Sequence, residues 1–228
     1  MLSMETNFQV AMDGPAGAGK STIAKLIAAR LHLTHIDTGA MYRAITYEAM
    51  QRGIDLTNPD AYNFLSATSV KFENNKIYLN DQDISSYIGS PEVSHHVSTV
   101  AAHPNVRAYM VQIQQQAATH GAIIMDGRDI GTVVLPYAPV KIFLTASVKE
   151  RAQRRYKDYQ AKGITSSYQE LEDEITRRDH LDSTRKTNPL KQADDAILFD
   201  TTNHTIEESV ELLVQLIQQR GQEHGYQF

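Results

Sequence analysis

The stretch GPAGAGKST, residues 14–22, combines glycines, a lysine and hydroxyl side chains in an order suited to binding phosphate. It follows an apolar run, precedes an amphipathic helical pattern and fits the phosphate-binding loop pattern G-x-x-x-x-G-K-[ST]. Glycines let backbone N–H groups turn inward around a phosphate, and the start of a helix adds a positive dipole. In such a loop Lys20 would reach the β- and γ-phosphates, and the Ser21 hydroxyl would ligate Mg²⁺. The residues predicted to hold a nucleoside triphosphate are Gly14, Pro15, Ala16, Gly17, Ala18, Gly19, Lys20, Ser21 and Thr22.

A dinucleotide-binding loop is the alternative for a glycine-rich turn between a strand and a helix. Gly14, Gly17 and Gly19 stand in the wrong order for G-x-G-x-x-G, and that motif has no use for a lysine. The loop alone does not separate a kinase from a GTPase switch or a motor ATPase. The second substrate must therefore be sought elsewhere in the chain.

Arginine stands beside small, hydroxyl or acidic residues in four further segments: IDTGAMYRA (36–44), VSTVAAHPNVR (97–107), MDGRDIGTVV (125–134) and ITRRDHLDSTR (175–185). Two of them begin where predicted strands end, which is the edge at which parallel sheets bind ligands. In the last, spacings of four and three put Arg178, Asp182 and Arg185 on one helical face. That face is either a binding surface or a solvated ion pair, and arginine before aspartate is the less favourable order for a pair.

The elements that must position these residues alternate between short apolar runs and helical periodicity. The predicted strands lie at about residues 8–12, 34–36, 122–125, 140–144 and 196–199. The predicted helices lie near residues 20–31, 40–52, 105–119, 147–161, 168–183 and 205–220. This alternation predicts an α/β fold, in which a parallel sheet carries helices on both faces.

One region interrupts that order. The stretch SVKFENNKIYLNDQDI, residues 69–84, predicts two short antiparallel strands around an Asn-Asn turn. We therefore expect an insertion at about residues 62–103. The C-terminal tail RGQEHGYQF is expected to be mobile.

Composition excludes several classes of protein. With 228 residues, 41% of them hydrophobic, the chain can bury the core of one globular domain. A net charge of −5 argues against a nucleic-acid polymer or an anionic membrane as partner. Cysteine is absent, which excludes disulfides and cysteine-based zinc sites. Because neither a signal-peptide pattern nor a long apolar run is visible, we expect a cytoplasmic protein without a membrane span.

In order and spacing these segments resemble the bacterial cytidylate kinases, P-loop nucleoside monophosphate (NMP) kinases that phosphorylate CMP and dCMP from ATP. The similarity runs from Phe8 to about residue 217 and rests on GPAGAGKST, DTGAMYR, DGRDIGTVV, APVKIFL and RRDHLDSTR. Adenylate and guanylate kinases resemble the family in the loop but not in the other four segments. The resemblance implies a P-loop NTPase fold with a five-stranded parallel sheet, a small antiparallel NMP-binding insertion and a lid. It divides the single chain into a core at 1–61 and 104–228, the insertion at about 62–103 and the lid at about 151–165.

The resemblance also implies ATP and CMP or dCMP as substrates, Mg²⁺ as cofactor and a monomeric enzyme. The residues that match the CMP site are Thr38, Tyr42, Arg43, Ser98, Arg107, Arg128, Asp129, Arg178, Asp182 and Arg185. Of these, Arg43 would fork onto the CMP phosphate, and Asp129 would accept a hydrogen bond from the cytosine amino group. The residues expected to be catalytic are Lys20, Arg128, Arg178 and Arg185.

The ATP side is assigned from the lid and from the residue after the loop lysine. Arg151 and Arg155 match the start of the lid and would reach the ATP phosphates, as would Arg154, which can instead pair with Asp158 on a solvated helix. Ser21 is the predicted metal ligand, although family members can carry glycine after the loop lysine.

The implied chemistry needs no general base. A phosphate monoester with a second pKa near 6 is already mostly an oxyanion at pH 7, so the protein has only to position and neutralise the reactants. Asp13 and Asp126 end strands near the loop and either hold waters of Mg²⁺ or cap the next turn.

Two other functions remain open. An NMP kinase that prefers UMP or another base would differ only in its base contacts. A nucleotide-dependent switch would hydrolyse ATP slowly and act through a partner, and it would show the N-K-x-D guanine signature or a long partner surface, neither of which is visible.

Overall fold

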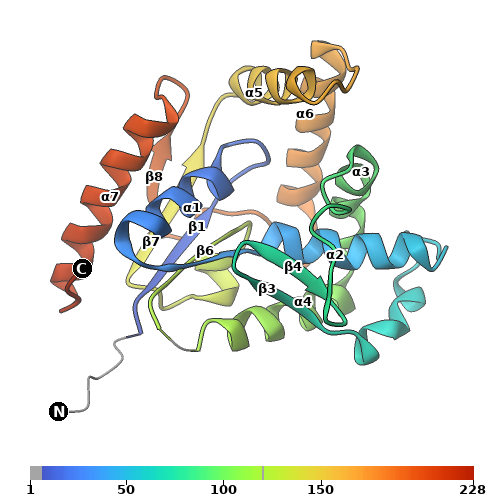
Figure 1. Cartoon of the computed structure of the whole chain (residues 1–228), viewed down its shortest axis with the longest axis horizontal. Coiled ribbons are helices and arrows are strands. Elements are labelled where there is room, and N and C mark those ends of the chain that lie inside the picture. Colours follow the sequence, from blue (N-terminus) through green and yellow to red (C-terminus); the bar gives the residue numbers. More distant parts are fainter. Residues whose placement is uncertain (1–6, 120) are drawn as a thin grey trace.

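The computed structural model describes residues 7–119 and 121–228, which are built around one five-stranded sheet (Figure 1). In sheet order the strands are β2 (Thr34–Asp37), β6 (Ile123–Gly127), β1 (Gln9–Asp13), β7 (Val140–Thr145) and β8 (Ile197–Asp200). Every adjacent pair is parallel, so all the carboxyl ends meet at one edge. The α/β fold and the strand positions expected from the sequence are confirmed.

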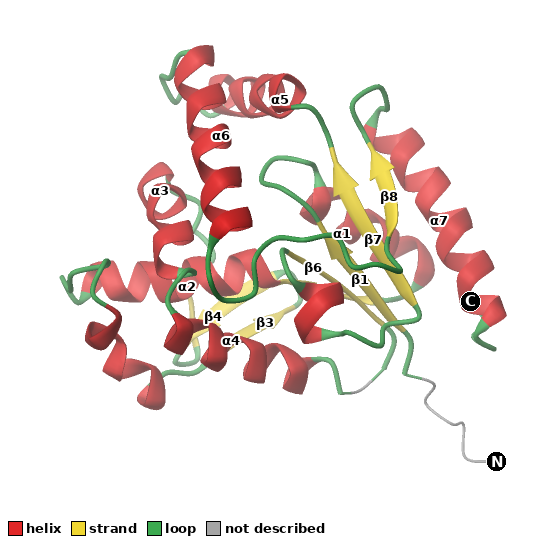
Figure 2. Cartoon of the chain, turned by 180° about the vertical axis from the view of Figure 1, so that it is seen from behind, coloured by secondary structure: helices red, strands yellow, loops and turns green. Residues whose placement is uncertain are grey.

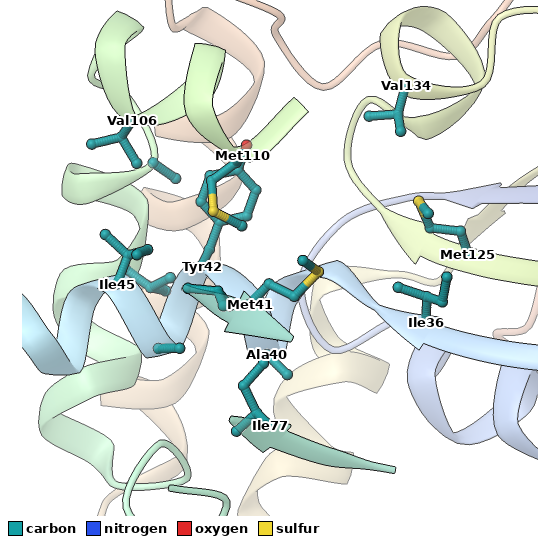
Figure 3. Close-up of a cluster of buried hydrophobic side chains, with 14 of the residues drawn as sticks. Ile36, Ala40, Met41, Tyr42, Ile45, Ile77, Val106, Met110, Met125 and Val134 are labelled. Carbon is teal, nitrogen blue, oxygen red and sulfur yellow. The ribbon is translucent and has the colours of Figure 1, made fainter. Parts of the chain in front are cut away.

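Helices cover both faces of this sheet because its strands are apolar on both sides. The covering helices are α1 (Lys20–Leu31), α2 (Thr38–Gln51), α4 (Pro104–Ala117) and α7 (Ile206–Glu223). Val10 and Met12 of β1 share a core with α1 and α7, whereas Ala11 between them shares the other core with α2 and α4. Figure 3 shows this second core, with Met41 of α2 beside the sheet residues Ile36 and Met125.

The interruption between α2 and α4 is a small antiparallel sheet with helices on either side. Its elements are η1 (Pro59–Ala67, a 3-10 helix), β3 (Val70–Glu73), β4 (Lys76–Leu79), β5 (Gln82–Asp83) and α3 (Pro91–Val100). Asn74 and Asn75 take left-handed φ angles of 52° and 59°, as a two-residue hairpin turn requires. The predicted hairpin is therefore confirmed, whereas β5 and α3 were not expected from the pattern. Ile77 and Leu79 of β4 pack into the same core as α2, which ties the hairpin to the main sheet.

Two helices stand beyond the carboxyl edge of the sheet. They are α5 (Val148–Ala161) and α6 (Tyr168–Thr184), and Figure 2 shows them past the arrowheads of β7 and β8. Ser147 caps α5, and Ser167 and Glu170 form a capping box at the start of α6. This arrangement brings one face of α6 over the ends of the central strands.

The expectation of a mobile C-terminal tail is wrong for this structure. Helix α7 continues to Glu223, and Tyr226 stacks on Phe8 with ring centroids 4.5 Å apart. Phe228 meets the same ring edge-on at 5.3 Å. The partner residue lies at the other end of the chain, so local periodicity could not reveal this packing. Across 7–119 and 121–228, no helix has the length and apolar character needed to cross a membrane.

Candidate active site

A cavity of about 240 Å³ lies at the carboxyl edge of the sheet. Its walls come from the glycine-rich loop, the starts of α1 and α2, helices α3 and α4, the turn after β6, and α6. All the residues expected to bind CMP line it: Thr38, Tyr42, Arg43, Ser98, Arg107, Arg128, Asp129, Arg178, Asp182 and Arg185. Segments that are far apart in the sequence therefore meet in one place.

The glycine-rich loop forms the end of this cavity that leads into α1. Gly14, Gly17 and Gly19 all have positive φ angles, and a Cβ atom on Gly14 would lie 1.9 Å from the Leu144 carbonyl oxygen. Gly14 is thus required both by backbone angle and by the close approach of β7. The loop residues that line the cavity are Ala16, Gly17, Gly19, Lys20, Ser21 and Thr22, whereas Gly14, Pro15 and Ala18 shape the turn behind it.

Lys20 is buried at the first turn of α1, and its Nζ donates to the Pro15 carbonyl oxygen at 2.7 Å. Burial, followed by the neighbouring charge of Arg128, holds the pKa of Lys20 well below its usual range. An anionic ligand in the cavity would favour the charged ammonium. This position suits a lysine that contacts phosphate.

Ser21, directly after the lysine, donates from Oγ to Asp126 Oδ2 at 2.8 Å. Asp126 ends β6 and is 2% exposed, and its Oδ1 lies 2.8 Å from His35 Nε2. A hydroxyl and a carboxylate side by side at a phosphate loop suit Mg²⁺, which takes few protein oxygens and completes its shell with water and phosphate. In the part of the chain that the structure describes, no cluster of three or more His, Asp or Glu residues could hold a metal by itself. Ser21 and Asp126 are therefore the side chains that would fit Mg²⁺ at this loop.

Asp13, for which capping a turn was one of the two expected roles, does cap one. Its oxygens accept from the backbone N–H groups of Ile130 and Gly131, each at 2.7 Å, so both are committed to the turn η2 (Ile130–Val134). Burial is the main cause that raises the pKa of Asp13 to about 6. Asp13 thus fixes the turn that follows Asp129 through two backbone bonds.

The face of α6 predicted from spacing points into the cavity. Asp182 accepts from Arg128 Nε at 2.9 Å and lies 3.9 Å from Arg185 Nη1. Burial raises the pKa of Asp182, but the charges of Arg128, Arg178 and Arg185 outweigh that effect and lower it. Burial and the like charge of Arg128 lower the pKa of Arg178 to about 10. This face therefore lies against the cavity and is not a solvated ion pair, and its binding of a ligand stays a prediction.

Asp129 lies deeper, in an ion pair with Arg107 of α4, and its other oxygen is 3.7 Å from Arg185 Nη2. The Arg107 guanidinium also donates to the Ala101 carbonyl oxygen at 3.1 Å and faces the Tyr42 ring at 5.4 Å. At the start of α2, Arg43 pairs with Asp37 at 3.3 Å.

Several buried guanidinium nitrogens in this half of the cavity make no hydrogen bond to the described residues, although one of them, Arg185 Nη2, lies within ion-pair distance of Asp129. They are Arg107 Nε, Arg178 Nε and Arg185 Nη2. Native proteins rarely leave buried charged donors unpaired, because the desolvation cost is not recovered. Unsatisfied guanidinium groups around one cavity indicate an anionic ligand.

Comparison with known proteins agrees with this geometry. The sequence profile of the family described as cytidylate kinase matches residues 10–219. The chain belongs to the cytidylate kinase family. It is 49% identical to the cytidylate kinase of Acholeplasma laidlawii, over 92% of this chain and 95% of that one. Identity is 50% to the cytidylate kinase of Leuconostoc mesenteroides (93% and 97% covered) and 48% to that of a Geobacillus species (95% and 99%).

In this cytidylate kinase, the lid arginines Arg151 and Arg155 bond to the protein itself and lie outside the cavity. Arg151 donates to the Ala146 and Ala16 carbonyl oxygens, both at 2.9 Å, and to Asp179 at 2.6 Å. Its guanidinium is therefore occupied in bracing the back of the glycine-rich loop against α6. Arg155 pairs with Glu174 at 3.1 Å, and neither arginine lines the cavity.

Arg154 does not pair with Asp158, the partner proposed for a solvated helix. Its Nε bonds Glu150 at 2.9 Å, and its Nη2 donates to the Thr201 carbonyl oxygen at 2.9 Å. A contact from Arg151 or Arg155 to ATP remains a prediction for the nucleotide-bound enzyme.

Sequence reasoning missed two carboxylates, one that lines this cavity and one that supports it from behind. Asp37 lines the cavity, caps α2 through the Ala40 N–H at 2.8 Å and orients Arg43. An aspartate between a strand and a helix is a recognisable N-cap signal. Asp179 accepts a hydrogen bond from Arg151, which lies on a different helix. Spacing along α6 could not identify a partner that is distant in sequence.

Proposed function

We propose that this chain transfers the γ-phosphoryl group of ATP to CMP, and also to dCMP. The observation that carries the proposal is one cavity that joins Lys20 and Ser21 at one end to the unsatisfied guanidinium groups around Asp129 at the other. Two anionic reactants need opposing cationic sites at a fixed separation, because in-line transfer depends on positioning and charge neutralisation. The identity to cytidylate kinases supports cytosine as the base.

The acceptor half would hold CMP by its phosphate, ribose and base. Arg43, Arg107 and Arg185 would bind the phosphate, and Asp129 would accept from the cytosine amino group. Ser98 of α3 would contact the base, and Asp182 the ribose hydroxyls. Thr38 and Tyr42 would border the nucleotide, with Thr38 held by its bond to the Asp126 carbonyl oxygen at 2.7 Å.

The transfer itself would rest on four cations. Lys20, Arg128, Arg178 and Arg185 would neutralise the charge that spreads over the transferred phosphoryl group. The CMP phosphate is mostly ionised at pH 7, so no side chain has to remove a proton. Asp13 is committed to two backbone bonds and Asp182 to arginines, which fits a site without a general base.

Ser21 would hold Mg²⁺ directly and Asp126 would hold it through water, beside the ATP phosphates. When bound there, the metal supplies further neutralisation of the phosphate charge. The loop backbone and Lys20 would orient the β- and γ-phosphates. Arg151 and Arg155 would complete the ATP side after closure of the lid.

The chain would act as a monomeric cytoplasmic enzyme on free nucleotides, without a nucleic-acid or membrane partner. The acidic net charge of −5 argues against a nucleic-acid or anionic-membrane partner, and Arg43, Arg107, Arg128, Arg178 and Arg185 line the cavity. The core would comprise 1–61 and 104–228, with a CMP-binding insertion at about 62–103 and a lid at about 151–165.

The decisive experiment measures ADP release from ATP and Mg²⁺ with CMP, dCMP, UMP, AMP and GMP in turn. We expect turnover with CMP and dCMP and much less with the others. A preference for UMP would show that the enzyme is an NMP kinase with a base specificity other than cytosine. ADP release that does not respond to any monophosphate would support a nucleotide-dependent switch instead.

A further inference from the structure

His35 contacts the phosphate-binding site, yet none of the roles proposed above uses it. It lies on the edge strand β2, and its side chain is only 7% exposed. Its Nε2 lies 2.8 Å from Asp126 Oδ1, and Asp126 Oδ2 accepts from Ser21 Oγ at the same distance. A continuous hydrogen-bonded chain thus runs from β2 through the end of β6 to the first turn of α1.

The direction of these bonds assigns a task to the imidazole. A carboxylate oxygen only accepts, so the hydrogen atom between His35 and Asp126 belongs to Nε2. The Asp126 backbone is already fixed by strand pairing with Asp37, and by the Thr38 hydroxyl bond to its carbonyl oxygen. Rotation of the carboxylate about its own axis is the freedom that remains. A second bond on Oδ1 removes that freedom and fixes the direction of Oδ2.

The His35 ring is itself held in place by packing. It meets Phe72 of β3 edge-on, with ring centroids 5.7 Å apart and planes at 80°. Its Nδ1 is buried and has no hydrogen-bond partner among the described residues. A buried polar nitrogen without a hydrogen bond lowers the stability of the fold. If the ring only filled space, an apolar residue would therefore make the fold more stable than histidine does. The useful atom of His35 is therefore Nε2.

We propose that His35 is a positioning residue that sets the Asp126 carboxylate, and through it the Ser21 hydroxyl, for the hydrated Mg²⁺ of the bound nucleotide. The inference rests on the proposed function, because it assumes that Mg²⁺ enters with ATP at Ser21. Partners that orient metal-binding groups usually matter about 10-fold to 100-fold for metal affinity or activity. The effect of His35 should therefore appear in the metal dependence of nucleotide binding.

The test compares His35→Phe, which keeps a flat ring without a donor, with His35→Gln, which keeps an amide donor within reach of Asp126. Calorimetry measures the affinity of a non-hydrolysable ATP analogue for the full chain, with Mg²⁺ and with EDTA. We expect the factor by which Mg²⁺ raises the affinity for the analogue to be about 10-fold smaller in the Phe variant. The affinity measured in EDTA should be the same as in the wild type. The Gln variant should recover most of the enhancement. His224→Phe, an exposed histidine in the tail, is the matched control and should behave as the wild type.

The outcomes separate this inference from the proposed function. If Mg²⁺ does not enhance analogue binding to the wild type, the proposed metal role itself fails. If it does and the Phe variant keeps the full enhancement, His35 does not position Asp126. Equal loss in the Phe and Gln variants would also overturn the inference, because packing and not the donor would then be responsible.

A measurement on the wild type covers the case in which the Phe variant does not fold. Nitrogen-15 NMR of labelled histidine follows the His35 ring, whose signal is assigned by its absence from the Gln variant. Adding Mg²⁺ to the complex with the analogue should shift that signal, while the His224 signal stays unchanged. A His35 ring that does not respond to the metal would overturn the inference.

Discussion

Arg107 of α4 and Asp129 of the turn after β6 form an ion pair that is almost fully buried, with side chains 1% and 4% exposed. Burying two charges costs more than their attraction returns unless the remaining polar atoms are also satisfied. Here Arg107 Nε lacks a partner among the described residues, and Arg185 is the other cation close to Asp129. The pair leaves Arg107 Nε without a hydrogen bond beside a cavity that Arg128, Arg178 and Arg185 also line, an arrangement that suits an anionic ligand.

Lys20→Met should leave the fold intact and strongly reduce turnover. The substitution removes the positive charge with which the Lys20 side chain would stabilise the phosphoryl group during transfer. Loss of such a preorganised contact typically costs about 3–4 kcal/mol, or about 10² to 10³ in rate. Steady-state ADP release with ATP and CMP measures the effect. Lys25→Met, an exposed position on the same helix, is the control. A Lys20 variant with near-normal turnover would refute the assigned role.

ATP binding should be accompanied by proton uptake at Lys20. Burial and Arg128 hold the pKa of this lysine well below its usual range in the free enzyme, and the phosphates of ATP would raise it again. Because the unprotonated fraction grows with pH, uptake should increase as the pH rises. Calorimetry in buffers of different ionisation enthalpy measures the uptake. The same uptake in Lys20→Met would assign the proton to another group.

The insertion and the lid should close over the two nucleotides, since water in an open site would compete as acceptor and waste ATP. Hydrogen exchange in segments near 62–103 and 151–165 should slow when an ATP analogue and CMP are both bound. Either nucleotide alone should protect less. Unchanged exchange in both segments would argue against closure.

Local sequence patterns were sufficient for the strands of the main sheet and the helices around it, but not for β5, α3 or every long-range contact. The glycine-rich loop and the α6 spacing were readable because turn chemistry and helix geometry act within a few residues. Arg151 is expected to contact ATP, and that contact stays a prediction; in this structure it bonds Ala16 and Asp179. Its partners lie on other elements, so its type and neighbours in sequence could not distinguish a support from a phosphate contact.

The C-terminal tail is the clearest case of a contact that only the fold reveals. Removing residues 224–228 would expose Phe8, which is 2% exposed beneath Tyr226 and Phe228. The truncated chain should lose about 1–3 kcal/mol of unfolding free energy, typical of uncovering one large apolar side chain. Urea denaturation measures the loss, and turnover at low temperature should be unchanged. Equal stability of the two chains would mean that the tail does not cover Phe8 in solution.

We expect Asp129 to select cytosine over uracil. Cytosine presents an amino donor where uracil presents a carbonyl acceptor, so a carboxylate bonds the first and repels the second. A buried carboxylate oxygen that faces a carbonyl acceptor in place of an amino donor would cost about 1–3 kcal/mol, or roughly 10-fold to 100-fold in kcat/KM. The bond to Arg107 adds an alternative, in which Asp129 only neutralises that arginine.

Asp129→Ala should therefore weaken the use of CMP sharply while changing the use of UMP little, or even improving it, so that the ratio between them collapses. The same change leaves Arg107 buried without its partner, which typically costs about 3–5 kcal/mol of stability. The ratio of kcat/KM for CMP and UMP is the correct measurement, because loss of folded enzyme lowers both values equally. Asp129→Asn keeps the size of the side chain and should also reduce the ratio. If both substrates lose the same factor in both variants, Asp129 is a structural partner of Arg107, and base selection lies elsewhere.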